Sequence, residues 1–305
     1  MSRYLITGAA GMLGRDLQTV FADRDVTALS RADLDITDYV AVVKAVAGHD
    51  FIINASAYTA VDDAETHEDA ATAVNGTGAG NLARAAADIG AILVQYSTDY
   101  VFRGDATTPY PEDAPIDPVS AYGRSKALGE KLATEFSVDR SYIVRTAWLY
   151  GQHGPNFAST MLRLASERDT LTIVGDQVGQ PTWTVDLARA TLLLLDSAAP
   201  FGIYHGTNSG QASWFDFAQA IFTEAGLDHE RVTPTTSAEF VRPAPRPSYS
   251  VLGHNSWIAA GLPAMRDWKE ALAEAFSSGA VGALGSVTNA GNVASSAPSS
   301  NSGTS

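Results

Sequence analysis

A tyrosine and a lysine four residues apart, Tyr122 and Lys126, form the pair whose types and spacing most clearly predict chemistry. Residues four apart share one face of a helix, so both side chains can enter one site. A free tyrosine titrates near about 10, which is too high for efficient proton transfer at neutral pH. A nearby lysine cation favours the phenolate and lowers that pKa, and it can also hydrogen-bond a ribose. The pair therefore predicts a tyrosine acid–base site.

A second group with possible chemistry is the run Ser97–Phe102, which follows a predicted buried strand. Ligands of an open parallel sheet sit outside the carboxyl ends of its strands. We expect Thr98, rather than Ser97, to hydrogen-bond a substrate carbonyl beside Tyr122. A hydroxyl that only caps the end of a strand is the general alternative.

Three glycines follow the first predicted strand with the spacing G-x-x-G-x-x-G. Glycines let the backbone turn tightly and approach a pyrophosphate, and the N–H groups at the start of the next helix can bind it. An ordinary tight turn between strand and helix is the alternative reading. The position after the very first strand favours a dinucleotide site, which would include Gly8, Gly11, Met12, Leu13 and Gly14.

The end of the second predicted strand bears on the choice of cofactor. NAD enzymes place an acidic residue there, ~20 residues past the glycines, to bind the ribose 2′-hydroxyl. This chain has Leu29-Ser30-Arg31 instead, with no carboxylate at the tip. A hydroxyl and a guanidinium suit the 2′-phosphate of NADPH, with NADH and a merely structural surface arginine as alternatives. Asp35 and Ile36 are expected to border the adenine.

The elements that must position these residues alternate as βαβ units do, which predicts a Rossmann-like, doubly wound parallel sheet of the α/β class. The predicted strands are Arg3–Thr7, Val26–Leu29, Phe51–Asn54, Ile92–Ser97 and Tyr142–Thr146. The predicted helices are Ala71–Ile89, Ala121–Phe136, Phe157–Glu167 and Trp214–Ala225, and Pro243, Pro245 and Pro247 mark an irregular, exposed loop.

Three regions follow from this pattern. Residues 1–150, completed by parts of 183–205, are expected to form the cofactor-binding domain, and residues 151–277 mainly a smaller C-terminal α/β lobe for the substrate. From Ser278 to Ser305 the chain contains no charged residue and is rich in Gly, Ser, Ala and Asn. Such a composition predicts disorder.

Composition excludes several classes of function. The net charge of −14 argues against binding nucleic acid through bulk electrostatics. The absence of cysteine rules out disulfides, zinc–thiolate sites and thiol catalysis. The N-terminal segment is not a signal peptide and no apolar run is long enough to span a membrane, so we expect a cytoplasmic protein without a membrane partner.

Taken together, the motifs resemble the extended short-chain dehydrogenase/reductase family, and within it the dTDP-4-dehydrorhamnose reductases. The resemblance runs from Arg3 to about Phe276. It rests on nine segments: GAAGMLG (Gly8–Gly14), NASAYTAVDDAE (Asn54–Glu65), VNGTG (Val74–Gly78), YSTDYVFRG (Tyr96–Gly104), YGRSK (Tyr122–Lys126), RTAWLYG (Arg145–Gly151), NFASTMLRLA (Asn156–Ala165), DQVGQPT (Asp176–Thr182) and RPSYSVL (Arg246–Leu252).

This resemblance implies a function and a set of roles. NADPH would transfer a hydride to C4 of a dTDP-linked 4-keto-6-deoxy sugar, converting dTDP-4-dehydro-L-rhamnose to dTDP-L-rhamnose, in the synthesis of a polysaccharide precursor. By resemblance, Thr98, Tyr122 and Lys126 form the catalytic triad. The remaining implied contacts are Ala55, Ser56 and Ala57 to the cofactor, Asp99 and Trp148 to the sugar, and Asn156 and Arg246 to the diphosphate.

No metal is needed for this reaction. Some members of the family dimerise through a metal bound partly by a glutamate, where this chain has Asp16. The shorter side chain argues against a Mg²⁺-linked dimer, so a monomer and a homodimer both stay open.

Related activities are weighed by the same motifs. The 4,6-dehydratases carry a Thr-Asp-Glu run, whereas Thr98-Asp99 is followed here by Tyr100. Another nucleotide-sugar 4-ketoreductase or epimerase of this fold stays an alternative. So does a non-catalytic, NADP-binding regulatory subunit.

Overall fold

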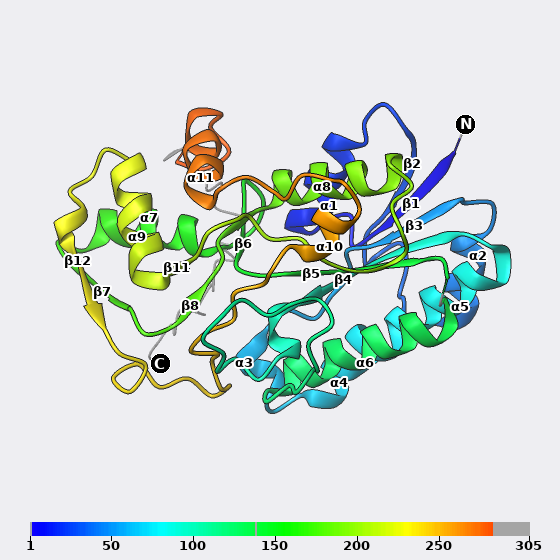
Figure 1. The fold of residues 1–305 in the computed structure, drawn as a ribbon, viewed down its shortest axis with the longest axis horizontal. Coiled ribbons are helices and arrows are strands. Elements are labelled where there is room, and N and C mark those ends of the chain that lie inside the picture. Colours follow the sequence, from blue (N-terminus) through cyan, green and yellow to red (C-terminus); the bar gives the residue numbers. More distant parts are fainter. Residues whose placement is uncertain (1, 138, 283–305) are drawn as a thin grey trace, which may run out of the picture.

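The computed structural model describes residues 2–137 and 139–282, and its centre is a six-stranded parallel sheet (Figure 1). The strand order is β10-β5-β4-β3-β1-β2. Their bounds are β1 Arg3–Thr7, β2 Asp25–Leu29, β3 Phe51–Asn54, β4 Ile92–Thr98, β5 Ser141–Thr146 and β10 Gly202–His205. The five predicted strands are confirmed to within one residue at either end, and the predicted Rossmann-like class is confirmed with them.

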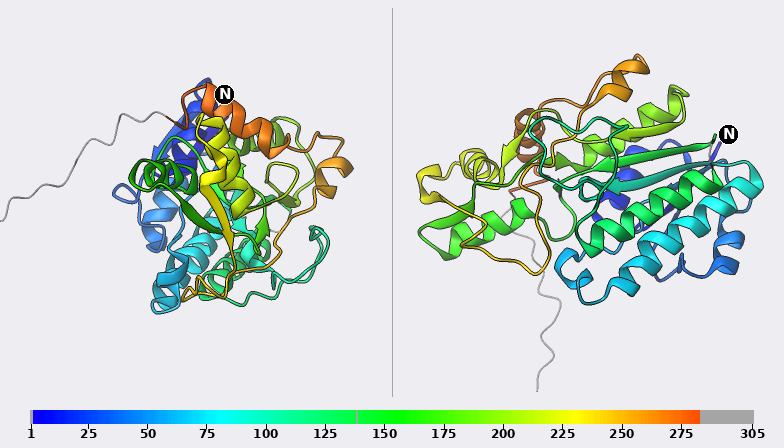
Figure 2. Two further views of the ribbon diagram at one scale, coloured as in Figure 1. Left: turned by 90° about the vertical axis from the view of Figure 1, so that its left-hand side faces the viewer. Right: turned by 60° about the horizontal axis from the view of Figure 1, so that its bottom comes forward.

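Apolar side chains alternate between the two faces of this sheet, as successive strand residues must. Tyr4 and Ile6 pack with α1 (Met12–Val20) and α8 (Thr184–Asp196), which cover one face. Leu5 belongs to the core of the other face. The helices that cover that face are α2 (Tyr39–Val46), α5 (Ala79–Ile89) and α6 (Ala121–Phe136). Figure 2 shows both helical layers from a second direction.

A second hydrophobic core lies in the C-terminal half, and we call the elements around it the smaller lobe (Figure 1). Its helices are α7 (Phe157–Glu167), α9 (Trp214–Glu224) and α11 (Trp268–Ser277). Its strands pair in twos: β7 (Leu171–Val174) with β12 (Val232–Thr235), and β8 (Val178–Gly179) with β11 (Ala212–Ser213). The pair β6 (Leu149–Tyr150) and β9 (Thr182–Trp183) joins this lobe to the sheet region.

Between these lobe elements the chain returns to the main sheet. The helix α8 packs against α1, and β10 pairs in parallel with β5. Short helices complete the fold: α3 (Val61–Ala64), α4 (Glu68–Thr72), α10 (Asn255–Ala259) and two 3-10 turns, Asp99–Val101 and His229–Arg231. No helix among the described residues is both long and apolar enough to cross a bilayer.

The predicted regular helix over Ala71–Ile89 is wrong in its middle. The chain forms α4, then a π-helical turn over Ala73–Gly78, then α5. At this turn α6 comes very close, since a Cβ on Gly129 would lie 2.2 Å from the carbonyl oxygen of Asn75. The Asn75 side chain also exchanges two hydrogen bonds with the backbone of Tyr58, which lies in the loop after β3. The spacing of apolar residues in the sequence contains no sign of either contact, so it could not predict the π-helical turn.

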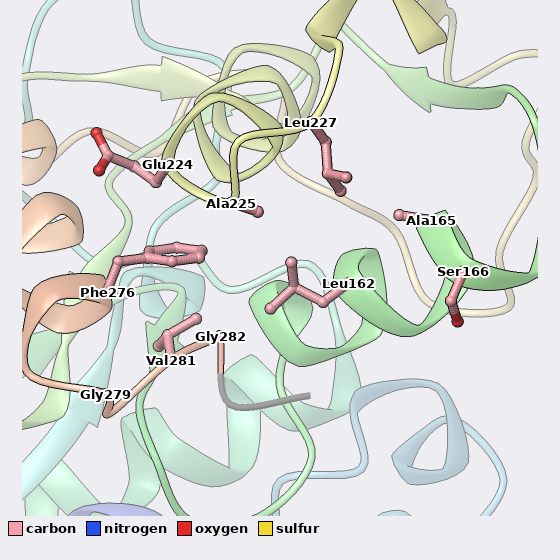
Figure 3. Close-up of a pocket in the computed structure, with 10 residues that line it drawn as sticks. All are labelled: Leu162, Ala165, Ser166, Glu224, Ala225, Leu227, Phe276, Gly279, Val281 and Gly282. Atoms are coloured by element: carbon pink, nitrogen blue, oxygen red, sulfur yellow. The ribbon is translucent and has the colours of Figure 1, made fainter. Parts of the chain in front are cut away.

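The predicted disorder from Ser278 onward is also wrong for its first residues. Gly279 adopts a left-handed conformation (φ +76°) directly after α11, which turns the chain back. Val281 then donates its N–H to the carbonyl of Ala275 at 2.9 Å and is only 6% exposed. Figure 3 shows Val281 and Phe276 on the wall of an apolar groove of about 420 Å³. The rest of the predicted segment, residues 283–305, lies outside the described residues.

Candidate active site

The three predicted catalytic side chains converge at the carboxyl end of β4. Thr98 is the last residue of that strand, and Tyr122 lies in the first turn of α6. The Ser120 hydroxyl caps this helix by accepting the Gly123 N–H at 3.0 Å, which fixes where the helix begins. The Thr98 hydroxyl lies within hydrogen-bonding reach of the Tyr122 hydroxyl. A carbonyl oxygen could therefore meet both hydroxyl groups.

Lys126 is held one turn further along α6 by the end of the sheet. It is 4% exposed, and its Nζ donates to the carbonyl oxygen of Tyr96 at 2.7 Å. The Gln95 amide donates to the same oxygen at 2.8 Å and accepts from the Asn54 side chain at 2.7 Å. Asn54 in turn accepts from Thr7 at 2.7 Å. This buried ladder joins the ends of β1, β3 and β4 and fixes the lysine to them.

Burial sets the protonation of these groups. Burial raises the pKa of Tyr122, the nearby Thr98 hydroxyl opposes that rise, and the neighbouring Asp99 charge adds to it. The expected lowering by Lys126 is therefore not met in this structure. Burial lowers the pKa of Lys126 to about 8, against the opposing charge of Glu130. A protonated tyrosine is the form that can donate a proton to a substrate.

Asp99 lies beside Thr98 and is fully enclosed. Burial raises the pKa of its carboxyl group to about 6, although the Ser250 and Thr98 hydroxyls oppose that rise. Thr98 donates to Asp99 Oδ1 at 2.9 Å, while Oδ2 has no hydrogen bond of good geometry to any described residue. Asp99 is thus a hydrogen-bond partner of Thr98 in this structure. The predicted contact of Asp99 with the sugar stays a prediction.

A cavity of about 620 Å³ lies where the strand order reverses between β1 and β3, the expected place for a dinucleotide. Gly8 forms its floor with φ +68°, and a Cβ there would lie 2.5 Å from the carbonyl group of Ala55. Only glycine fits this approach. Eight of the predicted cofactor residues line the cavity together: Gly8, Gly11, Arg31, Asp35, Ile36, Ala55, Ser56 and Ala57.

The other predicted cofactor residues near the glycines do not line this cavity with their side chains. Gly11 is the N-cap of α1 and offers no capping side chain, so the N–H groups of Met12, Leu13 and Gly14 begin the helix without a cap. Leu13 is buried in the core, and a Cβ on Gly14 would lie 2.2 Å from Gly8 O. Met12, Leu13 and Gly14 can therefore bind a phosphate only through their backbone N–H groups.

At the far end of the cavity the exposed Arg31 lies after β2. The Ser30 hydroxyl donates to Asp33 at 2.6 Å, so it holds the turn. Asp35 accepts from the N–H and hydroxyl of Thr37, which lowers the pKa of its carboxyl group, and the Arg31 charge lowers it slightly further.

A second cavity of about 650 Å³ lies between α7, β7 and the loop that carries Pro243 and Pro247. Its lining combines aromatic rings with guanidinium groups, chiefly Phe157, Trp214, Phe240, Arg168, Arg242 and Arg246. Tyr100 also lines it, and its ring meets that of Tyr122 edge-on with 5.6 Å between centroids. Tyr122 thus borders a residue of this cavity.

Tyr122 is tied to the cofactor cavity as well. Tyr58, which lines that cavity, packs with Tyr122 against one small cluster of buried alanines. Asn75 donates to Ser125 at 2.9 Å, and the Ser125 hydroxyl donates to the Tyr122 carbonyl at 2.7 Å. Tyr122 therefore has neighbours in both cavities.

Two predicted substrate residues have structural partners. Trp148, at φ +46°, stacks on Trp214 with 3.5 Å between ring centroids, so at least one face of its indole is covered. Asn156 forms a capping box with Ser159 at the start of α7 and donates to the Gly151 carbonyl at 2.9 Å. Their contacts to sugar and diphosphate stay predictions.

Several residues that line these cavities had no functional signal in the sequence: Tyr58, Tyr100, Phe157, Trp214 and Arg242. Tyr100 and Tyr58 lie inside quoted motifs but were given no binding role. Aromatic residues such as Trp214 are usually core residues, and only the fold brings this one to a cavity wall.

Asp16 is buried beneath α8 rather than presented at the surface. The Thr184 hydroxyl donates to its carboxylate, and His153 Nε2 lies 3.9 Å from Oδ1. Burial raises the pKa of Asp16, and these neighbours oppose the rise. Within residues 2–137 and 139–282 no group of three or more histidine and acidic side chains could hold a metal ion.

Comparison with known proteins agrees with this geometry. Residues 2–280 match the family described as RmlD substrate binding domain. A dTDP-4-dehydrorhamnose reductase from Streptomyces griseus is 50% identical over 90% of this chain and 93% of that protein. A dTDP-4-keto-6-deoxy-D-glucose reductase from Streptomyces niveus is 47% identical over 90% and 96%.

Among solved structures, a dTDP-4-dehydrorhamnose reductase from Bacillus anthracis in complex with NADP superposes with a TM-score of 0.87. It is 40% identical, and the match covers 91% of this chain and all of that one. The predicted family is confirmed: the chain belongs to the RmlD family, that of the dTDP-4-dehydrorhamnose reductases.

Proposed function

We propose that this protein uses NADPH to reduce the C4 keto group of dTDP-4-dehydro-L-rhamnose to dTDP-L-rhamnose. One observation carries the proposal: Tyr122, with Thr98 in reach and Lys126 one turn away, lies between a cavity shaped for a dinucleotide and a cavity lined by aromatic and arginine side chains. Its relatives with that activity support the choice of substrate.

The cofactor cavity suits NADPH. The open N–H groups at the start of α1 and the close backbone approach at Gly8 would hold the pyrophosphate. Arg31, exposed at the other end, would meet the 2′-phosphate, and no carboxylate occupies the position after β2 that favours NAD. NADP in the related Bacillus anthracis structure supports this preference over NADH.

The chain itself supplies the proton and the orientation. When bound, NADPH supplies the hydride. The Thr98 hydroxyl, which donates to Asp99 in this structure, would turn to donate to the C4 oxygen and hold it beside the Tyr122 hydroxyl. Tyr122 would then donate its proton as negative charge develops on that oxygen. One N–H of Lys126 is used by the Tyr96 carbonyl, so two of its three remain for the nicotinamide ribose. No step requires a metal ion.

The second cavity would bind the nucleotide. Aromatic rings such as Phe157 and Trp214 suit a base or the apolar face of a sugar, and guanidinium groups such as Arg246 suit a diphosphate. Trp148, stacked on Trp214, is the proposed contact for the sugar ring. Asn156 and Asp99 are proposed as further substrate contacts.

A second candidate function is the reduction of another dTDP-linked 4-keto sugar, which the Streptomyces niveus relative favours. The test is NADPH oxidation by the purified protein with each of two substrates, dTDP-4-dehydro-L-rhamnose and its epimer at C3 and C5, dTDP-4-dehydro-6-deoxy-D-glucose. Higher kcat/KM for the L-sugar supports the first function, and higher kcat/KM for the D-sugar supports the second. Binding of NADPH without turnover of either would instead identify a non-catalytic subunit.

A further inference from the structure

The loop of residues 240–247 is fastened to the cofactor side of the molecule through one carboxylate, Asp62. This residue lies in α3, directly after the cofactor-cavity residues Thr59 and Ala60. The loop lies about 180 residues later in the sequence, where Arg242 and Arg246 line the second cavity. Figure 1 shows the loop running back from β12 toward α3.

Both oxygens of Asp62 are used in this attachment. Oδ1 accepts from Arg246 at 2.8 Å and from the Ala244 N–H at 3.2 Å. Oδ2 accepts two hydrogen bonds from Arg242, one of them from Nε at 3.0 Å. The side chains of Asp62 and Arg246 are only 22% and 19% exposed, so water screens this pair less than a surface ion pair.

Arg246 is also held from its other side. It donates to the Tyr100 hydroxyl at 3.1 Å and lies over that ring, with 5.9 Å from the guanidinium carbon to the centroid. Tyr100 in turn meets the edge of Tyr122. Two of the five N–H donors of Arg246 are therefore used by the protein, and three are left for a ligand of the cavity.

These contacts have a consequence for ligand binding. An arginine held by two partners loses less side-chain entropy when it binds an anion than one that is free. Asp62 does not itself line the second cavity, so it can orient the guanidinium groups without occupying the anion's place. Hydrogen bonds and charge from the two arginines hold the pKa of Asp62 below its usual value although burial opposes this, so the carboxylate is ionised at neutral pH.

We propose that Asp62 is a positioning residue that holds Arg242 and Arg246 in place for the diphosphate of the nucleotide-sugar substrate. This inference rests on the proposed function. It assigns to Asp62, a residue remote from the reacting atoms, control over substrate affinity rather than over the chemical step.

The test is the variant Asp62→Asn, with dTDP as the probe of the second cavity. We expect its KM for the keto sugar and the dissociation constant of dTDP to rise about tenfold or more, as the loss of a charge-assisted hydrogen bond implies. We expect kcat at saturating substrate and the affinity for NADPH to change less than about twofold. Asp62→Glu, which keeps the charge, should recover part of the dTDP affinity.

Glu167→Gln is the matched control, because Glu167 pairs with Arg163 on the exposed surface of α7 outside the second cavity. It removes the same charge and should alter neither constant. A double-mutant cycle adds Arg246→Gln. Because Asp62 would act partly through Arg246 and partly through Arg242, the loss of dTDP affinity in the double variant should be smaller than the sum of the two single losses.

Hydrogen exchange gives a readout that does not depend on turnover. The Ala244 amide should exchange faster in Asp62→Asn than in the wild type, since it donates to that carboxylate. Unchanged dTDP affinity in Asp62→Asn would overturn the proposal, and so would losses that add fully in the double variant. Because dTDP binding and exchange need no keto sugar, failure of the proposed reaction would be seen separately, as absent NADPH oxidation by the wild type.

Discussion

Replacing Lys126 by methionine should stabilise the folded protein at neutral pH while it removes a proposed catalytic group. The lysine is 4% exposed and sits within the ladder at the end of the sheet. A methionine of similar length would fill the same space without a charge. The Tyr96 carbonyl would keep its hydrogen bond from Gln95.

The size of the effect follows from the cost of burying the ammonium. Burial lowers the pKa of Lys126 from 10.5 to about 8 in the folded protein. That difference corresponds to about 3 kcal/mol, since each pH unit is worth about 1.4 kcal/mol. The unfolded chain binds more protons at this lysine between pH 8 and 10.5, so wild-type stability rises with pH there. The cost is fully present below pH 8 and vanishes above 10.5.

Urea denaturation of wild type and Lys126→Met at pH 7 and at pH 10 measures this effect. We expect the variant to be more stable by about 3 kcal/mol at pH 7 and by less than about 1 kcal/mol at pH 10. Lys131→Met, on the exposed side of the same helix, should differ from the wild type by less than about 0.5 kcal/mol at either pH. A Lys126→Met variant that is less stable at pH 7, or whose advantage does not change with pH, would refute the reasoning.

Three other predictions concern the ends of the two cavities and the C-terminal turn. Arg31→Ala should weaken NADPH binding about tenfold or more relative to NADH, and equal losses of both in binding titrations would assign Arg31 to the surface. Val281→Ala should lower the free energy of unfolding by about 1.5 kcal/mol, because two buried methyl groups are lost; an unchanged urea midpoint would show that this turn is not docked. Trp148→Ala should lower kcat together with kcat/KM, whereas a change in KM alone in steady-state kinetics would contradict a contact near the keto group.

Much of the fold was predictable because parallel strands covered on both faces are short, nearly continuous apolar runs. The ends of α6 and α7 were predicted to the residue, and in both cases a capping side chain, Ser120 or Asn156, starts the helix. The π-helical turn and the docking of Val281 were missed. The π-helical turn depends on contacts with α6 and with the loop after β3, and Val281 docks into the core of the smaller lobe. Local composition contains no sign of these tertiary contacts.

The candidate site was predictable to the extent that its chemistry is local in sequence. Tyr122 and Lys126 are one helical turn apart, and the glycine turn joins consecutive elements. Asp62 could not be found in this way, because its two arginine partners follow about 180 residues later. The pKa of Tyr122 is another case: the lysine is near in sequence, but burial sets the direction of the shift in the folded protein and Thr98 opposes it.

The most direct test of the central claim follows the hydride that the reaction adds at C4 and the proton that Tyr122 would give to the C4 oxygen. Wild type and Tyr122→Phe are each given dTDP-4-dehydro-L-rhamnose and NADPH deuterated at one or the other face of nicotinamide C4. NMR of the product should show deuterium at sugar C4 from one of the two labelled forms, and Tyr122→Phe should be slower by ~10²–10⁴-fold with near-normal NADPH affinity. Deuterium absent from C4 with both forms, or a Phe variant that turns over at the wild-type rate, would contradict the account.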